Sequence, residues 1–445
     1  MNHRAALAVG VAIVAVLTAG AVGAAAPAVR PTPTPLGDAA VYQPRHVDPV
    51  LKQIEDADKA ATASADEQTA KVRDAQKARA ETSKKDENVL RFDLSRVARP
   101  SGPVAFRQAF HFPPVAQYLT GTCWSFSTTS FYESEVYRLT GQKVKLSEIW
   151  TVYWEYVEKM RRFVRERGDS LIEEGSESGA VARIWKQYGA VPEDAYPGVL
   201  SKDGRHDHSR LIAQLKQLSE WVRAHGVWDE ERVLAMARAI LDRELGVPPQ
   251  RVTYGGNEYA PQQFLSQVLK LNLDDYVEFM STLSVPFYTR GEFKVPDNWW
   301  HDDSYYNVPL EDWYGLAKSA VRRGFTAAIG GDVSEPGYNG FENVAVVPTF
   351  DIPQGNINQD AREFRFYNHA TEDDHGLHMV GITSVGGRDW FLIKDSARSS
   401  RWGKFEGYYF YRDDYVRLKM LTILVHRDAV KDLLARFTQQ PARSS

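Results

Sequence analysis

The chain has 445 residues and a formal net charge of −4, with 43% hydrophobic and 25% charged residues. This composition is typical of a globular protein, and it excludes a low-complexity chain and a strongly basic one, so no nucleic-acid partner is expected. The length allows one large domain or two smaller ones. Cys123 is the single cysteine, which excludes a disulfide within the chain.

Residues 1–26 have the pattern of an export signal or a membrane anchor. Arg4 precedes an uncharged, apolar run from position 5 to position 26, and small residues suited to cleavage follow. We expect a cleaved signal peptide. The alternative is an uncleaved anchor that tethers the protein to a membrane, because the run is near the minimum length of a span. Both predict an exported protein, periplasmic or extracellular.

Residues 27–91 are predicted to form a linker or stalk. The part from 27 to 48 is rich in Pro and Ala, and the part from 49 to 88 is charged with few large apolar residues. Such a segment cannot bury much surface. A solvated helix or a flexible stalk is favoured over a propeptide that covers an active site, because no clear apolar face is visible.

Residues 92–445 have the pattern of a folded domain. Helices are expected first, at 124–140, 148–167 and 207–245, the last within a helical insertion at about 205–285. β-like runs follow, at 327–329, 344–347, 379–385, 390–393 and 407–411, and a last helix is expected at 428–437. Helices before strands predict an α+β fold with segregated layers.

The candidate nucleophile is Cys123, which follows a turn containing Gly121 and opens a predicted helix. Unpaired backbone N–H groups and the positive end of the helix dipole there favour the reactive thiolate. Gln117 precedes the cysteine by six residues, so its side-chain amide can return as an oxyanion donor beside the Cys123 N–H. The alternative is a structural cysteine at a helix start.

The candidate base is His378, which enters the strand-like run 379–385. A hairpin with its turn at 386–389 would bring Asp395 back beside His378. A thiolate, an imidazole and a polar group that orients the imidazole are the parts needed for acyl transfer. His369 is an alternative base, but no apolar strand follows it.

His375 stands beside Asp373 and Asp374. His375 and His378, three residues apart, could be two ligands of a metal ion, but this hypothesis is weak because no further ligands have suitable spacing. We interpret these residues as a solvated acidic loop.

Several segments together resemble the papain-like cysteine peptidase superfamily, and within it the bleomycin hydrolase / aminopeptidase C branch. The segment from Gln117 through Cys123 to Ser127 resembles the nucleophile signature, and the segments at 378–381 and 393–403 resemble the histidine strand and the Asn-Ser-Trp-Gly region. The branch is indicated by the segments at 153–159, 188–192, 246–265 and 328–333. The resemblance runs from about residue 92 to residue 432.

This resemblance implies a papain-like fold with a helical left lobe, a β-barrel-like right lobe and a cleft between them. It implies a thiol protease that hydrolyses a peptide or protein substrate through a thioester, without a metal or organic cofactor. Cys123 would attack, His378 would shuttle the proton, Asp395 would orient the imidazole and Gln117 would help to hold the oxyanion. Relatives form hexamers, so a homo-oligomer is one expectation, although export fits poorly with a cytosolic cage.

Three departures from the family pattern leave the activity open. Asp395 stands where Asn is usual, which should raise the pKa of the histidine and move the alkaline limb of the pH profile upward. Ala397 replaces a Trp that covers this contact, which predicts a wetter site. The tail 438–445 lacks the apolar end of the arm that makes relatives aminopeptidases.

Three functions therefore compete. The first is a cysteine peptidase, aminopeptidase or endopeptidase. The second is an envelope acyl transferase that uses the same Cys-His chemistry. The third is a catalytically silent binding protein on a papain-like scaffold.

Overall fold

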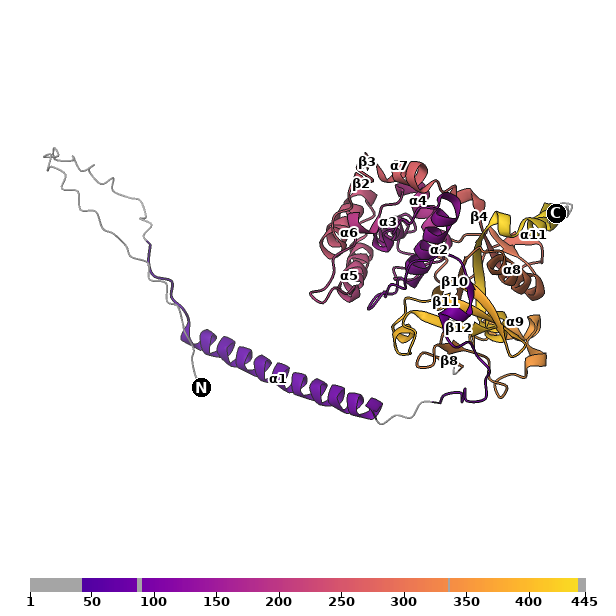
Figure 1. The fold of residues 1–445 in the computed structure, drawn as a ribbon. Helices are drawn as coiled ribbons and strands as arrows, with labels where there is room; N and C mark the ends of the chain where they lie inside the picture. The colour runs from indigo at the N-terminus through magenta and orange to yellow at the C-terminus, as the bar shows by residue number, and fades with distance from the viewer. Residues whose placement is uncertain (1–41, 86–89, 335–336, 439–445) are drawn as a thin grey trace, which may run out of the picture. The chain divides into compact units, whose positions relative to one another are not determined.

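A computed structural model describes residues 42–85, 90–334 and 337–438 (Figure 1). The chain falls into two compact units, Met1–Asn88 and Val89–Ser445, each described by itself below. The segment expected to be a signal peptide or anchor lies outside the described residues. Within the described residues, no helix combines the length and the apolar character needed to cross a membrane.

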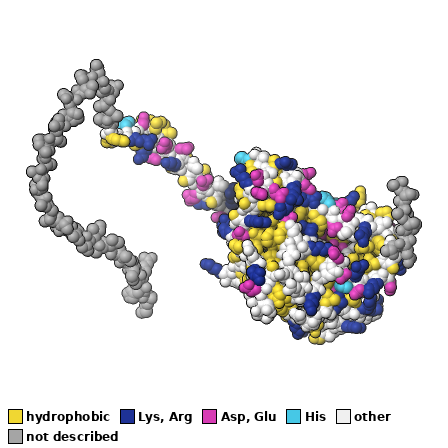
Figure 2. Space-filling model, turned by 90° about the horizontal axis from the view of Figure 1, so that it is seen from above, with side chains coloured by type: hydrophobic (Ala, Val, Ile, Leu, Met, Phe, Trp, Pro, Cys, Tyr) yellow, Lys and Arg dark blue, Asp and Glu magenta, His cyan; other side chains and the backbone are white. Residues whose placement is uncertain are grey.

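The described part of the first unit is dominated by one long helix, α1 (Pro49–Lys85). Its described side chains are all exposed, and Figure 2 shows Lys, Arg, Asp and Glu side chains along it. With 37 residues at a rise of 1.5 Å each, α1 is about 55 Å long. The charged segment at 49–88 is thus mostly a solvated helix, one of the two forms expected for it.

The second unit opens with a helical lobe. Its first helices are α2 (Cys123–Thr140), α3 (Glu148–Arg165) and α4 (Gly179–Tyr188). Gly141 ends α2 with a φ of 71°, a left-handed conformation that favours glycine. The Ser147 side chain accepts the Trp150 N–H at 3.0 Å and so caps the start of α3. The buried faces of these helices share one core.

The helical stretch expected at 207–245 is two helices, α5 (Ser209–His225) and α6 (Glu230–Leu245). Gly226 ends α5 with a φ of 62°, and the Asp229 side chain caps α6 by accepting the Arg232 N–H at 2.9 Å. The insertion continues through a hairpin, a short helix and one π-helical turn. These are β2 (Val252–Tyr254), β3 (Asn257–Tyr259), α7 (Pro261–Gln263) and η3 (Phe264–Leu269).

The sheet lobe is built on an eleven-stranded sheet with the order β5-β6-β4-β13-β7-β10-β11-β12-β9-β8, in which β1 also pairs with β10. The strands are β1 (Arg107–Gln108), β4 (Tyr276–Met280), β5 (Thr289–Gly291), β6 (Tyr305–Asn307), β7 (Ala327–Gly331), β8 (Tyr338–Asn339), β9 (Val344–Ala345), β10 (His375–Val385), β11 (Arg388–Lys394), β12 (Tyr408–Arg412) and β13 (Met420–His426). Four helices accompany them: α8 (Leu310–Arg322), α9 (Gln359–Tyr367), α10 (Asp413–Lys419) and α11 (Lys431–Thr438).

The two faces of this sheet pack differently. Buried side chains of α8 and α10 share a core with β7, β10, β11 and β13. On the other side, Ala328 of β7 and Leu424 of β13 join the core of the helical lobe. Figure 1 shows α2 on the sheet side of that lobe, near β10. The junction of the two lobes therefore lies where the first residue of α2 meets the first residues of β10.

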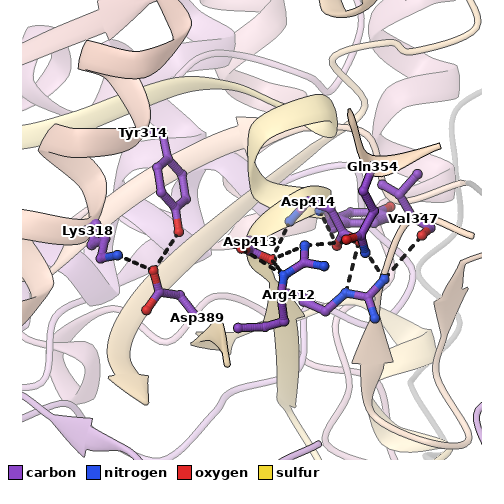
Figure 3. Close-up of polar contacts among 10 residues, drawn as sticks. Tyr314, Lys318, Val347, Gln354, Asp389, Arg412, Asp413 and Asp414 are labelled. Carbon is purple, nitrogen blue, oxygen red and sulfur yellow. Dashed lines mark hydrogen bonds and ion pairs between the residues drawn. The ribbon is translucent and has the colours of Figure 1, made fainter. Parts of the chain in front are cut away.

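Polar contacts fix the sheet around β11 and β12 (Figure 3). The Asp389 carboxylate accepts from the Tyr314 hydroxyl at 3.0 Å and pairs with Lys318 of α8. Arg412 donates to Asp414 at 2.5 and 2.9 Å. Both partners of this second pair are buried, so their pairing satisfies charges that would otherwise be costly to bury. The contacts of Asp389 anchor β11, which ends one residue before Asp395.

Candidate active site

Cys123 is the first residue of α2 and is partly exposed. The Trp124 indole donates to the Glu174 carbonyl oxygen at 3.0 Å, which ties the start of the helix to the segment before α4. The Gly376 N–H of β10 points at the Cys123 Sγ, 3.4 Å away. The sulfur thus lies where the two lobes meet, at the N-terminal end of a helix, as the sequence predicted.

His375, the first residue of β10, is the histidine at this thiol. Its Nε2 lies 2.7 Å from Asp395 Oδ1, and the Cys123 sulfur is another hydrogen-bond partner of the ring. Burial alone would lower the pKa of His375, but the Asp395 carboxylate and the sulfur outweigh it and hold that pKa well above its usual value. Burial would raise the pKa of Asp395, yet His375 and other donors keep it low. The ring therefore lies between a carboxylate and a sulfur, and both favour its protonated form.

His378, predicted to be the base, lies elsewhere. Its Nδ1 is 2.9 Å from the Ser130 hydroxyl, which also accepts from the Lys394 Nζ at 2.8 Å. The His378 side chain is completely buried, and its Nε2 has no partner among the described residues. Burial, Lys394 and His111 together hold the pKa of His378 well below its usual value. The prediction of His378 is corrected to His375, and the interpretation of His375 as part of a solvated loop is wrong.

The register of the β10–β11 hairpin explains the correction. Next to the turn, Val385 pairs with Arg388. If this register continued unchanged along the hairpin, His378 would stand opposite Asp395, which is the arrangement that the sequence suggested.

The register instead shifts by one residue between positions 379 and 381, at a β-bulge. Beyond the bulge His378 pairs with Lys394. A one-residue slip moves every following side chain to the other face of the sheet. Asp395 therefore shares its face with His375, three residues from His378 and so on the opposite side of the strand.

Two further groups hold the Asp395 carboxylate. The Ala397 N–H donates to Oδ1 at 2.8 Å, and the Tyr338 hydroxyl donates to Oδ2 at 2.9 Å. The Tyr338 ring stacks on Tyr409 with a centroid distance of 4.4 Å. Nothing in the sequence marked Tyr338, because it lies 57 positions before Asp395 in a segment without a motif.

The contact is also drier than expected for an Ala at position 397. The Asp395 side chain is 0% exposed and the His375 side chain 7% exposed. Solvent therefore screens their attraction only weakly.

Gln117 is held in the turn before the nucleophile. Its Nε2 donates to the Thr120 carbonyl oxygen at 2.7 Å, and its Oε1 accepts from the Ser396 hydroxyl at 2.6 Å. The Gln117 N–H donates to the Ser396 carbonyl oxygen at 3.0 Å, which ties this turn to the end of β11. Since a side-chain amide has two hydrogens, one remains for a substrate oxygen.

Gly376 sets how closely β10 approaches α2. A Cβ at this position would lie 2.9 Å from the Ser127 Oγ and 3.0 Å from the Trp124 Cα. Both contacts are tighter than ordinary van der Waals contact, so a side chain at position 376 would require β10 or α2 to shift. The close approach brings His375 to Cys123.

Within the described ranges, no group of three His, Cys, Asp or Glu side chains is placed to hold a metal ion. The candidate site instead combines Cys123, His375 and Asp395 in the order nucleophile, base and orienting group. A protonated imidazole beside a sulfur at a helix N-terminus is the arrangement that thiol acyl transfer needs.

The comparisons with known proteins agree with this class. No family model matches the chain. Over 263 residues the chain is 23% identical to Aminopeptidase C of Streptococcus thermophilus, which covers 49% of this chain and 58% of that protein. The chain thus spans little more than half the length of this relative.

The fold also has a solved counterpart. PepW of Lactobacillus rhamnosis HN001 superposes with a TM-score of 0.59 and 16% identity, over 77% of this chain and 86% of that chain. The predicted α+β, papain-like fold is therefore confirmed. The match to Aminopeptidase C supports the resemblance to papain-like cysteine peptidases of the bleomycin hydrolase / aminopeptidase C branch, and the likeness to PepW supports the fold.

Proposed function

We propose that the protein is a cysteine peptidase of the aminopeptidase C type, with Cys123 as nucleophile and His375 as its acid and base. One observation carries this proposal: the His375 ring lies between the Asp395 carboxylate and the Cys123 sulfur. Asp395 and the sulfur raise the pKa of His375, which favours the protonated ring that a peptidase of this type uses as its acid.

The reaction takes two acyl-transfer steps. The Cys123 thiolate attacks the carbonyl carbon of the scissile bond and forms a tetrahedral intermediate. His375 then gives its proton to the leaving nitrogen, the C–N bond breaks and a thioester remains. The neutral His375 next takes a proton from water, which attacks the thioester and releases the acid together with the thiolate.

The remaining residues position these groups. Asp395 accepts from the His375 Nε2, which directs the other ring nitrogen toward the sulfur. The Cys123 N–H and the remaining amide hydrogen of Gln117 are the candidate donors to the oxyanion, where each such donor contributes about 3 kcal/mol of transition-state stabilisation.

The substrate class that we propose is a peptide or protein. A homo-oligomer and an N-terminal membrane tether are proposed from the resemblance and from residues 1–26. Sedimentation of the full chain, and its release from membranes by detergent, would test them.

The test separates the two histidines. We would label the protein with a thiol-directed epoxide and follow peptide cleavage by mass spectrometry. Cys123→Ala should lose both signals. His375→Gln should lower kcat/KM by a factor of about 10² or more, since general acid–base catalysis contributes about 10² to 10⁴.

His378→Gln is the matched control, because it changes a histidine of the same strand that lies away from the sulfur. It should lower thermal stability and leave kcat/KM per folded molecule nearly unchanged. An equal loss in both histidine variants would refute the assignment of His375. Labelling without cleavage would favour a silent binding protein, and products formed only with an added amine would favour an acyl transferase.

A further inference from the structure

A small notch that contains the Arg401 guanidinium lies beside the candidate site. The cavity measures about 180 Å³ and is bounded by Pro114, Val115, Ala116 and Tyr118 on one side and by Ser400, Arg401, Glu406 and Gly407 on the other, with Asp395 also in its wall. Tyr118 directly follows Gln117, the residue placed for the oxyanion. The notch thus borders the turn before the nucleophile and the chain at Asp395, whose carboxylate is itself buried.

Arg401 supplies the notch with a positive charge that is paired with no carboxylate of the described residues. Its guanidinium carbon lies 4.6 Å from the centre of the Tyr118 ring. Its Nε is buried and makes no hydrogen bond, and none of its nitrogens is within 4 Å of a carboxylate of the described residues. Glu406, the exposed acid at the wall, is no ion-pair partner of Arg401. A guanidinium that is held by a ring, and whose Nε has no acceptor among the described residues, is placed for a ligand.

A second guanidinium lies on the same ring. The Arg205 carbon is 5.7 Å from the centre of the Tyr118 ring, and Arg205 forms no ion pair with the described residues. The backbone between them is fixed, because the Leu119 N–H donates to the His206 carbonyl oxygen at 3.2 Å. Tyr118 itself has a φ of 55°, a conformation that costs energy in a non-glycine residue and is concentrated at functional sites.

The position of the notch relative to the Cys123 sulfur indicates which half of a peptide substrate the notch contacts. The leaving nitrogen takes its proton from His375, so the leaving part of a peptide lies on the side of His375 and Asp395. Resting on the proposed peptidase function, we propose that Arg401, assisted by Arg205, binds a carboxylate on the leaving part of the substrate. The carboxylate is either the C-terminus of a short peptide or an Asp or Glu side chain.

Four peptides that share one acyl half test the proposal. They differ only beyond the scissile bond: a free C-terminal acid, its amide, and internal Glu or Gln at a fixed position. Wild type should favour the acid over the amide, or Glu over Gln, by about tenfold in kcat/KM, because one hydrogen bond to a charged group is worth about that factor. A preference for the acid over the amide would indicate a terminal carboxylate, and a preference for Glu over Gln would indicate a side-chain carboxylate.

Arg401→Gln should abolish this preference while kcat/KM for the neutral peptides stays within about twofold. Arg401→Lys should keep part of it, because Lys retains the charge but not the forked donor. Arg398→Gln is the matched control, since Arg398 is an exposed cation of the same segment outside the notch. A preference that survives in Arg401→Gln, or that falls equally in Arg398→Gln, would overturn the proposal.

The full-length Cys123→Ala protein gives a second measurement that needs no turnover. Calorimetric titration with the four peptides should show the same preference in Kd, and adding Arg401→Gln should remove it. Equal affinities for all four peptides would refute the notch as a carboxylate site. If wild type neither cleaves peptides nor reacts with the epoxide, while the Cys123→Ala protein still shows the binding preference, the peptidase function would be refuted and the notch would stand.

Discussion

Replacing Asp395 by Asn tests the electrostatic part of the site. Asn keeps the shape of the side chain, and its oxygen can still accept from His375 Nε2 and the Ala397 N–H, which both meet Oδ1 now. Its amide nitrogen would face the Tyr338 hydroxyl, which can turn to accept. The exchange therefore removes a charge with little change in packing.

The size of the effect follows from the contact. The charged pair is 2.7 Å apart and almost completely buried. A hydrogen bond between charged groups is worth about 1.5–3 kcal/mol, and one pKa unit corresponds to about 1.36 kcal/mol. The pKa of His375 should therefore fall by about one to two units in Asp395→Asn.

The alkaline limb of the kcat/KM profile reports loss of the His375 proton. Because Asp395 raises this pKa, its removal should move the limb toward lower pH, while the maximum rate changes less. We would measure kcat/KM between pH 4 and pH 10 for both proteins under one buffer system of constant ionic strength. Identical alkaline limbs, or a shift toward higher pH, would show that the carboxylate does not hold the proton on His375.

Three further perturbations follow from the packing around the site. Gly376→Ala should lower kcat/KM by about 10², because a Cβ there would push β10 away from α2 and misplace His375; a rate like that of wild type would contradict the close approach. Tyr338→Phe removes a donor from the Asp395 carboxylate, so the pKa of that carboxyl should rise; a carboxyl titration followed by NMR that is the same in both proteins would show that this hydrogen bond is unimportant. Lys394→Met removes a buried cation whose pKa is lowered from 10.5 to about 8, chiefly by burial. Between these two pH values only the unfolded state keeps the proton on Lys394, so the unfolding free energy of wild type should rise with pH relative to that of the variant, by up to about 3 kcal/mol. Urea denaturation of both proteins at pH 7.5 and pH 10 measures this. The same difference in unfolding free energy between the two proteins at both pH values would contradict the prediction.

The parts of the site that depend on local sequence were predictable. A glycine turn followed by Cys123 and an amphipathic run indicates a helix start, and α2 begins at this residue. Asp395 was predicted to face His378; it does meet a histidine of the preceding strand, but that histidine is His375. The class of protein and the fold followed from these segments because each motif lies within a few consecutive residues.

The choice of histidine was not predictable in the same way. His375 and His378 both precede an apolar strand, and the turn alone pairs His378 with Asp395. A bulge changes the register by one residue, and its position depends on packing against neighbouring strands and α2, which local patterns do not contain. Tyr338 and Gly376 were missed for a related reason, since their roles come from contacts with distant segments.

The division of the insertion into α5 and α6 shows an intermediate case. Gly226 and Asp229 are recognisable stop and start signals. They were outweighed by the long run of helix-forming residues on both sides. Giving such end signals more weight than composition would have predicted the break.

Because Cys123 is the single cysteine among 445 residues, a thiol reagent can label this protein at one defined position. Any maleimide or iodoacetamide that reacts can do so at a single atom, so moles of label per mole of chain count competent sites without mutagenesis. A dye placed there would report from the junction of the lobes. A single thiol is also vulnerable, because one oxidation of Cys123 would abolish the proposed activity. No second thiol in the chain could restore Cys123 by thiol–disulfide exchange.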